Sequence, residues 1–258
     1  MSVHSEYKGA YALLHDDEEE DLVGSDWHQR AIISLYNSLN DLAANTGQPW
    51  HVGNQLPLAA WKPNGDPWSP SPDIMIYPDA GPTKRDGMSA RDDGLPALIV
   101  EVASPSTWRY DVDAVAGKAA GYLALDVPEY LVFDPTGRFL RPPCRAWRLV
   151  GGVARPWQPE PDGRYMSHAL SIALSPDGDL LRVCDSQNRP IPYDYEKAQI
   201  LATQAQELHA RAQELHARNW RTCALKPRRR PPLVMTKRLH PEYVGACSRP
   251  QSRIPWAA

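Results

Sequence analysis

The most constraining feature of this chain is a pair of acidic residues placed on otherwise apolar strands. Glu101 lies in the middle of the apolar run 97–104, and Asp73 directly precedes the apolar run 74–77. Charged side chains are almost never fully buried without a partner, because desolvating an isolated ion is very costly. The two acids therefore require compensation, and a divalent metal ion would supply it.

The sequence around these acids predicts helices alternating with strands. Apolar residues recur at helical spacing from Ala31 to Leu42, after a cap at Ser25 or Asp26. Apolar runs bounded by Gly, Pro, Asn and Asp predict strands at 50–58, 72–77, 97–103 and 130–133.

A second helix is predicted at 112–125, capped by Asp111 or Asp113. Two glycines inside it weaken the helix by roughly 1 kcal/mol each relative to alanine. They would also let the helix pack closely on a sheet, which would bring Lys118 near the face of the strands.

Beyond Pro135 the apolar segments are shorter, and we expect 146–150, 170–174 and 181–183 to extend the sheet in antiparallel fashion. Residues 194–220 are expected to be helical, and the heptapeptide 205–211 is repeated verbatim at 212–218. Two copies are fewer than the three or four heptads that identify a coiled coil. An exposed terminal helix is the preferred interpretation, with a homodimer through this helix left open.

Composition and charge divide the chain into four parts. These are an acidic leader (1–24), a globular domain (25–193), the C-terminal helix (194–220) and a basic, Pro/Arg-rich tail (221–258) that is expected to be disordered. The tail carries nine Lys and Arg against one acid, so its charge is +8 and that of residues 1–220 is −11. Such an acidic body does not by itself favour attraction to DNA.

The overall composition is that of a globular protein, with 42% hydrophobic and 23% charged residues. There is no apolar run of the ~20 residues that a membrane span needs, and the N-terminus does not resemble a signal peptide. The four cysteines are far apart and form no C-x-x-C pair. We therefore expect reduced thiols, no membrane partner and a cytoplasmic location.

The acids and the lysine suggest a specific chemistry. Adjacent strands lie ~4.8 Å apart, so Asp73 and Glu101 could share one ion, with the Val102 carbonyl as a third oxygen ligand. Mg²⁺ or Mn²⁺ prefers such oxygen ligands and can activate water for hydrolysis of a phosphodiester. A nearby lysine, Lys118, could orient that water and stabilise developing negative charge.

Several short motifs in order resemble the Uma-two family of restriction endonucleases, within the P-D…(D/E)-x-K nuclease superfamily. The matching segments are Pro72-Asp73, Ile99 to Thr107, Arg109 to Asp111, Lys118, Val127 to Tyr130 and Phe133 to Pro135. The resemblance covers about residues 25–190. It implies an α/β (α+β mixed-sheet) fold, a restriction-endonuclease-like core with helices flanking a central mixed sheet.

The chain departs from the superfamily pattern at one position. The residue two after Glu101 is Ala103, so the lysine within the strand is absent. The resemblance implies that Lys118, on the following helix, takes its place.

Simpler roles compete for several polar residues. Asp73 alone would be interpreted as a turn or strand-end residue. Asp26 and His28 are interpreted as a helix cap and a surface side chain, although some nucleases of the superfamily that the chain resembles place an extra acid or histidine near the metal at this point. Asp111 is interpreted as a helix cap, with a hydrogen bond within the active-site loop as the alternative. The segment Ser104-Pro105-Ser106 is interpreted as a turn, since no G-x-S-x-G elbow is present.

The sequence thus predicts an Mg²⁺-dependent endonuclease acting on DNA, with Asp73, Glu101 and Lys118 as catalytic residues and Asp73, Glu101 and Val102 as metal ligands. One alternative is a catalytically degenerate nuclease fold used for DNA binding or protein interaction. Another is an enzyme of the same fold acting on RNA or branched DNA.

Overall fold

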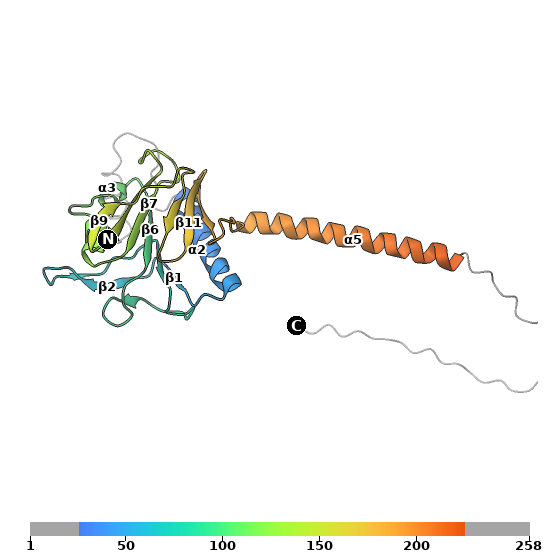
Figure 1. Ribbon diagram of the computed structural model, residues 1–258, viewed down its shortest axis with the longest axis horizontal. Helices are drawn as coiled ribbons and strands as arrows, with labels where there is room; N and C mark the ends of the chain where they lie inside the picture. The colour runs from blue at the N-terminus through green and yellow to red at the C-terminus, as the bar shows by residue number, and fades with distance from the viewer. Residues whose placement is uncertain (1–25, 225–258) are drawn as a thin grey trace, which may run out of the picture. The chain divides into compact units, whose positions relative to one another are not determined.

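The computed structural model describes residues 26–224, so the predicted leader and most of the predicted tail lie outside the described residues. A six-stranded sheet forms the centre of the fold (Figure 1). Only its pair β6–β7 is parallel, which makes the sheet mixed, as expected. Its order is β1 (His51–Asn54), β4 (Ile74–Tyr77), β6 (Leu98–Val102), β7 (Glu129–Phe133), β8 (Cys144–Val150) and β9 (Val153–Pro156).

Two smaller sheets accompany the central one. The first has the order β3 (Pro67–Trp68), β2 (Leu58–Trp61) and β5 (Met88–Ser89), and the second has the order β10 (Tyr165–Ser167), β11 (Ile172–Asp177) and β12 (Leu180–Cys184). The prediction that the later segments extend the main sheet holds for β8, which pairs antiparallel with β7. It is wrong for 170–174 and 181–183, whose apolar side chains pack across one face of the main sheet instead of pairing at its edge.

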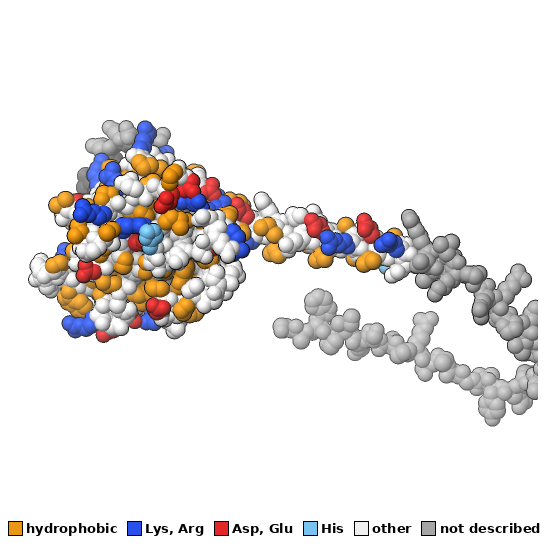
Figure 2. All heavy atoms as spheres, in the orientation of Figure 1, with side chains coloured by type: hydrophobic (Ala, Val, Ile, Leu, Met, Phe, Trp, Pro, Cys, Tyr) orange, Lys and Arg blue, Asp and Glu red, His pale blue; other side chains and the backbone are white. Residues whose placement is uncertain are grey.

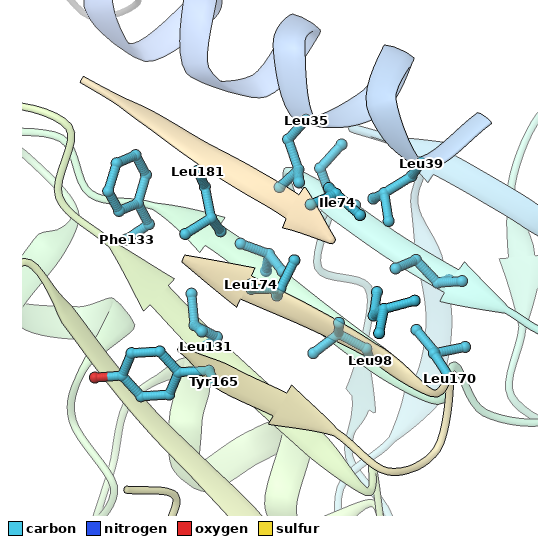
Figure 3. Packing of buried hydrophobic residues seen from close by; sticks show 14 of the residues in the cluster. Leu35, Leu39, Ile74, Leu98, Leu131, Phe133, Tyr165, Leu170, Leu174 and Leu181 are labelled. Atoms are coloured by element: carbon cyan, nitrogen blue, oxygen red, sulfur yellow. The ribbon is translucent and has the colours of Figure 1, made fainter. Parts of the chain in front are cut away.

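The helix α2 (Asp26–Thr46) and the sheet β10–β12 cover the same face of the central sheet (Figure 3). Leu35 and Leu39 of α2, one helical turn apart, are fully buried in a cluster that includes Ile74 and Leu98 of the sheet. Leu174 of β11 belongs to the same cluster. This apolar layer fixes β4 and β6 on one face of the sheet, and the side chains of Asp73 and Glu101 lie on the other face.

The other face is covered by α3 (Trp108–Asp111), α4 (Lys118–Ala124) and the sheet β3-β2-β5, around a second apolar cluster. The predicted helix 112–125 is too long at its start. Gly117 is the N-cap of α4, and the Asp113 carboxylate accepts bonds from the amides of residues 115 and 116 in a preceding turn. Gly121 permits close packing as predicted, but against Trp68: an added Cβ would lie 2.5 Å from its ring.

The predicted strand 50–58 is interrupted at Gln55, which has a positive φ of 51°. The chain therefore leaves β1 after Asn54 and starts the separate strand β2 at Leu58. The left-handed conformation is uncommon for a residue other than glycine, and such residues cluster at functional sites.

The last described element is the long helix α5 (Asp194–Ala224). The described residues divide into two compact units between positions 204 and 205, and this boundary falls within the helix. No helix in the described part of the chain is both long enough and apolar enough to cross a bilayer. Cys144 and Cys184 are buried free thiols.

The packing of α2 can be tested by comparing two of its apolar residues. Leu39→Ala should lower the free energy of unfolding by about 2–5 kcal/mol, because a fully buried side chain leaves a cavity. Ile33 lies on the same helix but is 50% exposed, so Ile33→Ala should cost well under half as much. Urea denaturation of both variants measures the difference, and equal losses would contradict this packing of α2.

Candidate active site

The strand register brings the two predicted acids together. Ile74 of β4 pairs with Val100 of β6 in antiparallel fashion, so Asp73 and Glu101 are next to each other across the two strands. The amide of Asp73 lies 3.4 Å from Glu101 Oε2 and donates to it. The amide of Val102 donates to Asp73 Oδ2 over 2.8 Å. Glu101 is 1% exposed and Asp73 8%, so both acids are buried as the sequence suggested.

Lys118 is the first residue of α4 and joins this pair from the helix side. Its Nζ lies 3.1 Å from Glu101 Oε2 and 3.0 Å from Asp111 Oδ1. The structure therefore places the three residues that the sequence singled out in one cluster. Gly117 allows this approach, because a Cβ at that position would overlap the Tyr110 carbonyl oxygen at 2.0 Å.

Asp111 is a third acid of the cluster: the preferred prediction that it caps a helix is wrong, and the alternative, a hydrogen bond within the active-site loop, is what the structure has. It is the last residue of α3 and is 1% exposed. Thr107 donates its hydroxyl to Asp111 Oδ2 over 2.7 Å, and Tyr130 donates to the Asp111 carbonyl over 2.8 Å. These bonds fix the Asp111 side chain so that its second oxygen meets Lys118.

His28 and Gln55 contact Asp73 from two other elements. His28 Nε2, in the first turns of α2, lies 3.5 Å from Asp73 Oδ2. The preferred prediction of a surface histidine is therefore wrong, and the alternative, a histidine beside the acidic cluster, agrees with the structure. The Gln55 side-chain amide donates to Asp73 Oδ1 over 3.3 Å. Gln55 lies in the left-handed turn that follows β1, and no sequence pattern indicated its contact with Asp73.

Tyr122 completes the surroundings of Glu101. Its buried hydroxyl lies 3.1 Å from Glu101 Oε1 and donates to it. Tyr122 follows Lys118 by four residues, a spacing that puts both side chains on one face of a helix. That spacing was a usable signal in the sequence.

The environment shifts the pKa values of the acids in opposite directions. Burial works to raise the pKa of Asp73, but hydrogen bonds from His28, the Val102 amide and Gln55 outweigh it and hold the pKa below its usual range. Burial raises the pKa of Glu101 to about 8, although the Lys118 ammonium opposes the rise. Burial also raises the pKa of Asp111.

Lys118 remains charged in this environment. Burial alone would lower its pKa, but the Glu101 and Asp111 carboxylates raise it above the usual value for lysine. The cluster thus combines one ammonium that stays protonated with three carboxyl groups. Two of these, Glu101 and Asp111, have raised pKa values and are harder to ionise.

The donor set suits a hard divalent cation. In the described residues no three His, Cys, Asp or Glu side chains surround a common metal position. Mg²⁺, however, is usually held by one or two carboxylates together with waters and substrate phosphates. Asp73 and Glu101 supply two carboxylates. The Val102 amide points at Asp73, and a strand residue directs its N–H and C=O to the same side, so the Val102 carbonyl suits the third oxygen.

The raised pKa of Glu101 predicts a pH dependence of stability in metal-free protein. The folded state keeps a proton on Glu101 up to about pH 8, whereas the unfolded carboxyl loses it near its ordinary pKa of 4.5. Between these values the folded state binds more protons, so stability falls as the pH rises. Glu101→Gln should flatten this fall and raise the melting temperature at pH 8 by about 2 °C or more.

Thermal unfolding in EDTA from pH 5 to pH 9 measures this effect. Glu160→Gln, at an exposed surface position, is the matched control and should leave the wild-type profile unchanged. A Glu101→Gln profile parallel to that of the wild type would contradict the assignment of a raised pKa.

Comparison with known proteins agrees with the sequence resemblance. Residues 8–168 match the Uma2 family, described as "Putative restriction endonuclease". No curated protein matches the chain. A solved structure described as a "putative nuclease belonging to DUF820" from Anabaena variabilis aligns with 57% of this chain and 74% of its own, at 15% identity and a TM-score of 0.36. The family match spans more than half of the sequence, and this chain belongs to the Uma2 family of restriction-endonuclease-type nucleases.

Proposed function

We propose that this protein is a divalent-metal-dependent endonuclease that hydrolyses phosphodiester bonds of DNA. The observation that carries the proposal is the convergence of Asp73, Glu101 and Lys118 from three elements into one buried cluster. Family membership supports the nuclease class, and the family description supports DNA as the substrate. Mg²⁺ or Mn²⁺ is the cofactor that the oxygen donors favour.

Each residue has a role that follows from its contacts. A bound divalent ion would supply Lewis-acid activation of water and neutralise charge on the phosphate. Asp73, ionised and held by three donors, provides a fixed carboxylate ligand. Glu101 provides a second, and Tyr122 orients it by donating to the oxygen Oε1.

Lys118 has the role of the displaced superfamily lysine. Its ammonium is positioned by Glu101 and Asp111 at 3.1 and 3.0 Å and carries positive charge over the whole physiological range. A charge fixed in this way before the reaction can orient the attacking water and stabilise the transition state. Asp111 acts through Lys118 and is therefore a positioning residue.

The proposal predicts that cleavage requires both metal and the two acidic ligands. Wild-type protein should cut DNA with Mg²⁺ or Mn²⁺ and not in EDTA. Asp73→Asn and Glu101→Gln should each reduce single-turnover cleavage by ~10²-fold or more, because each removes a charge that is needed to bind the cation.

Asp126→Asn is the matched control for these variants. Asp126 is exposed and has a positive φ of 68°, a conformation that asparagine tolerates, so its activity should equal that of the wild type. Undiminished cleavage by Asp73→Asn or Glu101→Gln would remove the support for this site. Metal-independent DNA binding by a wild type that never cleaves would favour the degenerate alternative.

Lys118 gives a separate prediction. Lys118→Ala should lower the single-turnover rate by ~10²-fold or more, as for the loss of one preorganised electrostatic group, while Mn²⁺ binding persists. Lys118→Arg should not restore the rate, since a planar guanidinium does not replace a compact ammonium between two carboxylates.

The measurement for Lys118 pairs single-turnover cleavage with calorimetric titration of Mn²⁺ into each variant. Lys62→Ala, at an exposed lysine, should behave like the wild type in both assays. If Lys118→Ala cleaves at the wild-type rate, Lys118 only compensates buried charge and takes no part in the reaction.

A further inference from the structure

The side of the central sheet that carries the acids also exposes arginines without acidic partners. These are Arg109 of α3, Arg138 of the loop 134–143 and Arg145 of β8, which we call the arginine surface. None of the three forms an ion pair with a carboxylate in the described part of the chain. Most other arginines up to residue 193 are paired with acids. The exception therefore lies beside the candidate active site.

The strand register places Arg145 on the same face of the sheet as Glu101. Glu101 of β6 pairs with Val132 of β7, and Val132 pairs with Arg145 of β8. Directly paired residues of neighbouring strands point to one face. Since neighbouring strands lie ~4.8 Å apart, the backbones at Glu101 and Arg145 are ~10 Å apart. That separation corresponds to about three nucleotides of one DNA strand, whose phosphates follow at ~3.4 Å along the helix axis.

Two aromatic residues connect α3 to the loop 134–143. The rings of Trp108 and Phe139 stack with their centroids 5.9 Å apart, and the Arg109 guanidinium lies 4.6 Å from the centroid of the Trp108 ring. Both aromatic side chains are half-buried against the second apolar cluster, on the face where Arg145 is exposed. Arg109 and Arg138 directly follow and precede these two rings in sequence, so the stack holds all three arginines on one side of the sheet.

The acids on the same segments are engaged elsewhere. Asp111 faces Lys118. The Asp134 carboxylate accepts bonds from four backbone N–H groups and from the Thr136 hydroxyl within its own loop. Asp113 accepts bonds from backbone amides in the turn after α3. The three guanidinium groups are therefore not neutralised by direct pairing, and Figure 2 shows Lys and Arg side chains gathered at the end of the molecule where Figure 1 draws α3 and β9.

We propose that the arginine surface binds the phosphate backbone of DNA next to the acidic cluster. The inference rests on the proposed function, because it takes DNA as the substrate of that site. A guanidinium group presents several N–H donors in a fixed fork that matches a phosphate, and it stays charged at physiological pH. Because the three arginines have no acidic partners, no ion pair has to break before DNA binds. A local positive surface of this kind lets a body with a net charge of −11 over residues 1–220 hold a polyanion.

DNA binding by the full chain tests the inference. Fluorescence anisotropy with a labelled duplex in EDTA measures affinity without cleavage. Arg109→Gln, Arg138→Gln and Arg145→Gln each remove one charge from an exposed side chain. Each should raise the dissociation constant by ~3-fold or more at low salt and reduce the slope of log K against log salt concentration by about 0.9, and the triple variant should reduce the slope by about 2.7.

Arg155→Gln is the matched control. Arg155 is exposed on β9 and pairs with Arg148, which is three residues from Arg145 along β8, so Arg155 lies on the opposite face of the sheet. This variant loses the same charge and should bind DNA like the wild type. The basic tail is present in every variant, so its contribution to the affinity cancels in the comparison.

Wild-type affinity and salt slope in the triple variant would overturn the inference, and so would an equal loss in Arg155→Gln. Tighter binding by the triple variant would indicate that the arginines hold the chain's own acidic leader (1–24), which would also overturn it. Cleavage assays with Mg²⁺ separate this inference from the proposed function. A wild type that binds DNA through the arginines but never cleaves would refute the proposed function and support this surface. A wild type that cleaves but binds DNA independently of the arginines would refute this surface alone.

Discussion

Burial of three carboxyl groups around one ammonium is the constraint on which the rest of the site depends. Fully ionised, Asp73, Glu101, Asp111 and Lys118 would carry a net charge of −2 in a region almost closed to solvent. Without metal, part of this charge is removed by protons, as the raised pKa values of Glu101 and Asp111 indicate. One divalent cation would balance the same charge without protons, which explains in physical terms why the cluster suits metal binding.

The fold assembles this cluster from segments that are far apart in sequence. The antiparallel pairing of β4 with β6 sets Asp73 beside Glu101, and the connection from β6 to the parallel strand β7 carries both Asp111 and Lys118. Apolar packing on the opposite face, where α2 and β10–β12 lie, fixes the two strands. The acids occupy the face that α3 and α4 cover, beside the second apolar cluster, and His28 of α2 reaches Asp73 from the other side.

Much of this arrangement is predictable from local pattern. An acid inside an apolar strand is a strong signal, and the strand and helix order around Asp73, Glu101 and Lys118 follows from periodicity and turn residues. Contacts that depend on tertiary convergence are not predictable in that way. His28 and Gln55 reach Asp73 from separate elements, and Asp111 turns toward Lys118 because Thr107 and Tyr130 fix it. Among the contacts that the sequence analysis missed, only that of Tyr122 could have been predicted, because Tyr122 follows Lys118 by four residues and so lies on the same face of the helix.

The central claim, that the buried carboxylates form a metal centre, is tested most directly by locating a metal ion. Crystals of the wild-type protein grown with Mn²⁺ should show an anomalous difference peak between the carboxylates of Asp73 and Glu101, and this peak should be lost in Asp73→Asn. Such a peak would establish the ligands independently of any activity assay. A map with no peak at this cluster at saturating Mn²⁺, or with Mn²⁺ bound only elsewhere, would contradict the account.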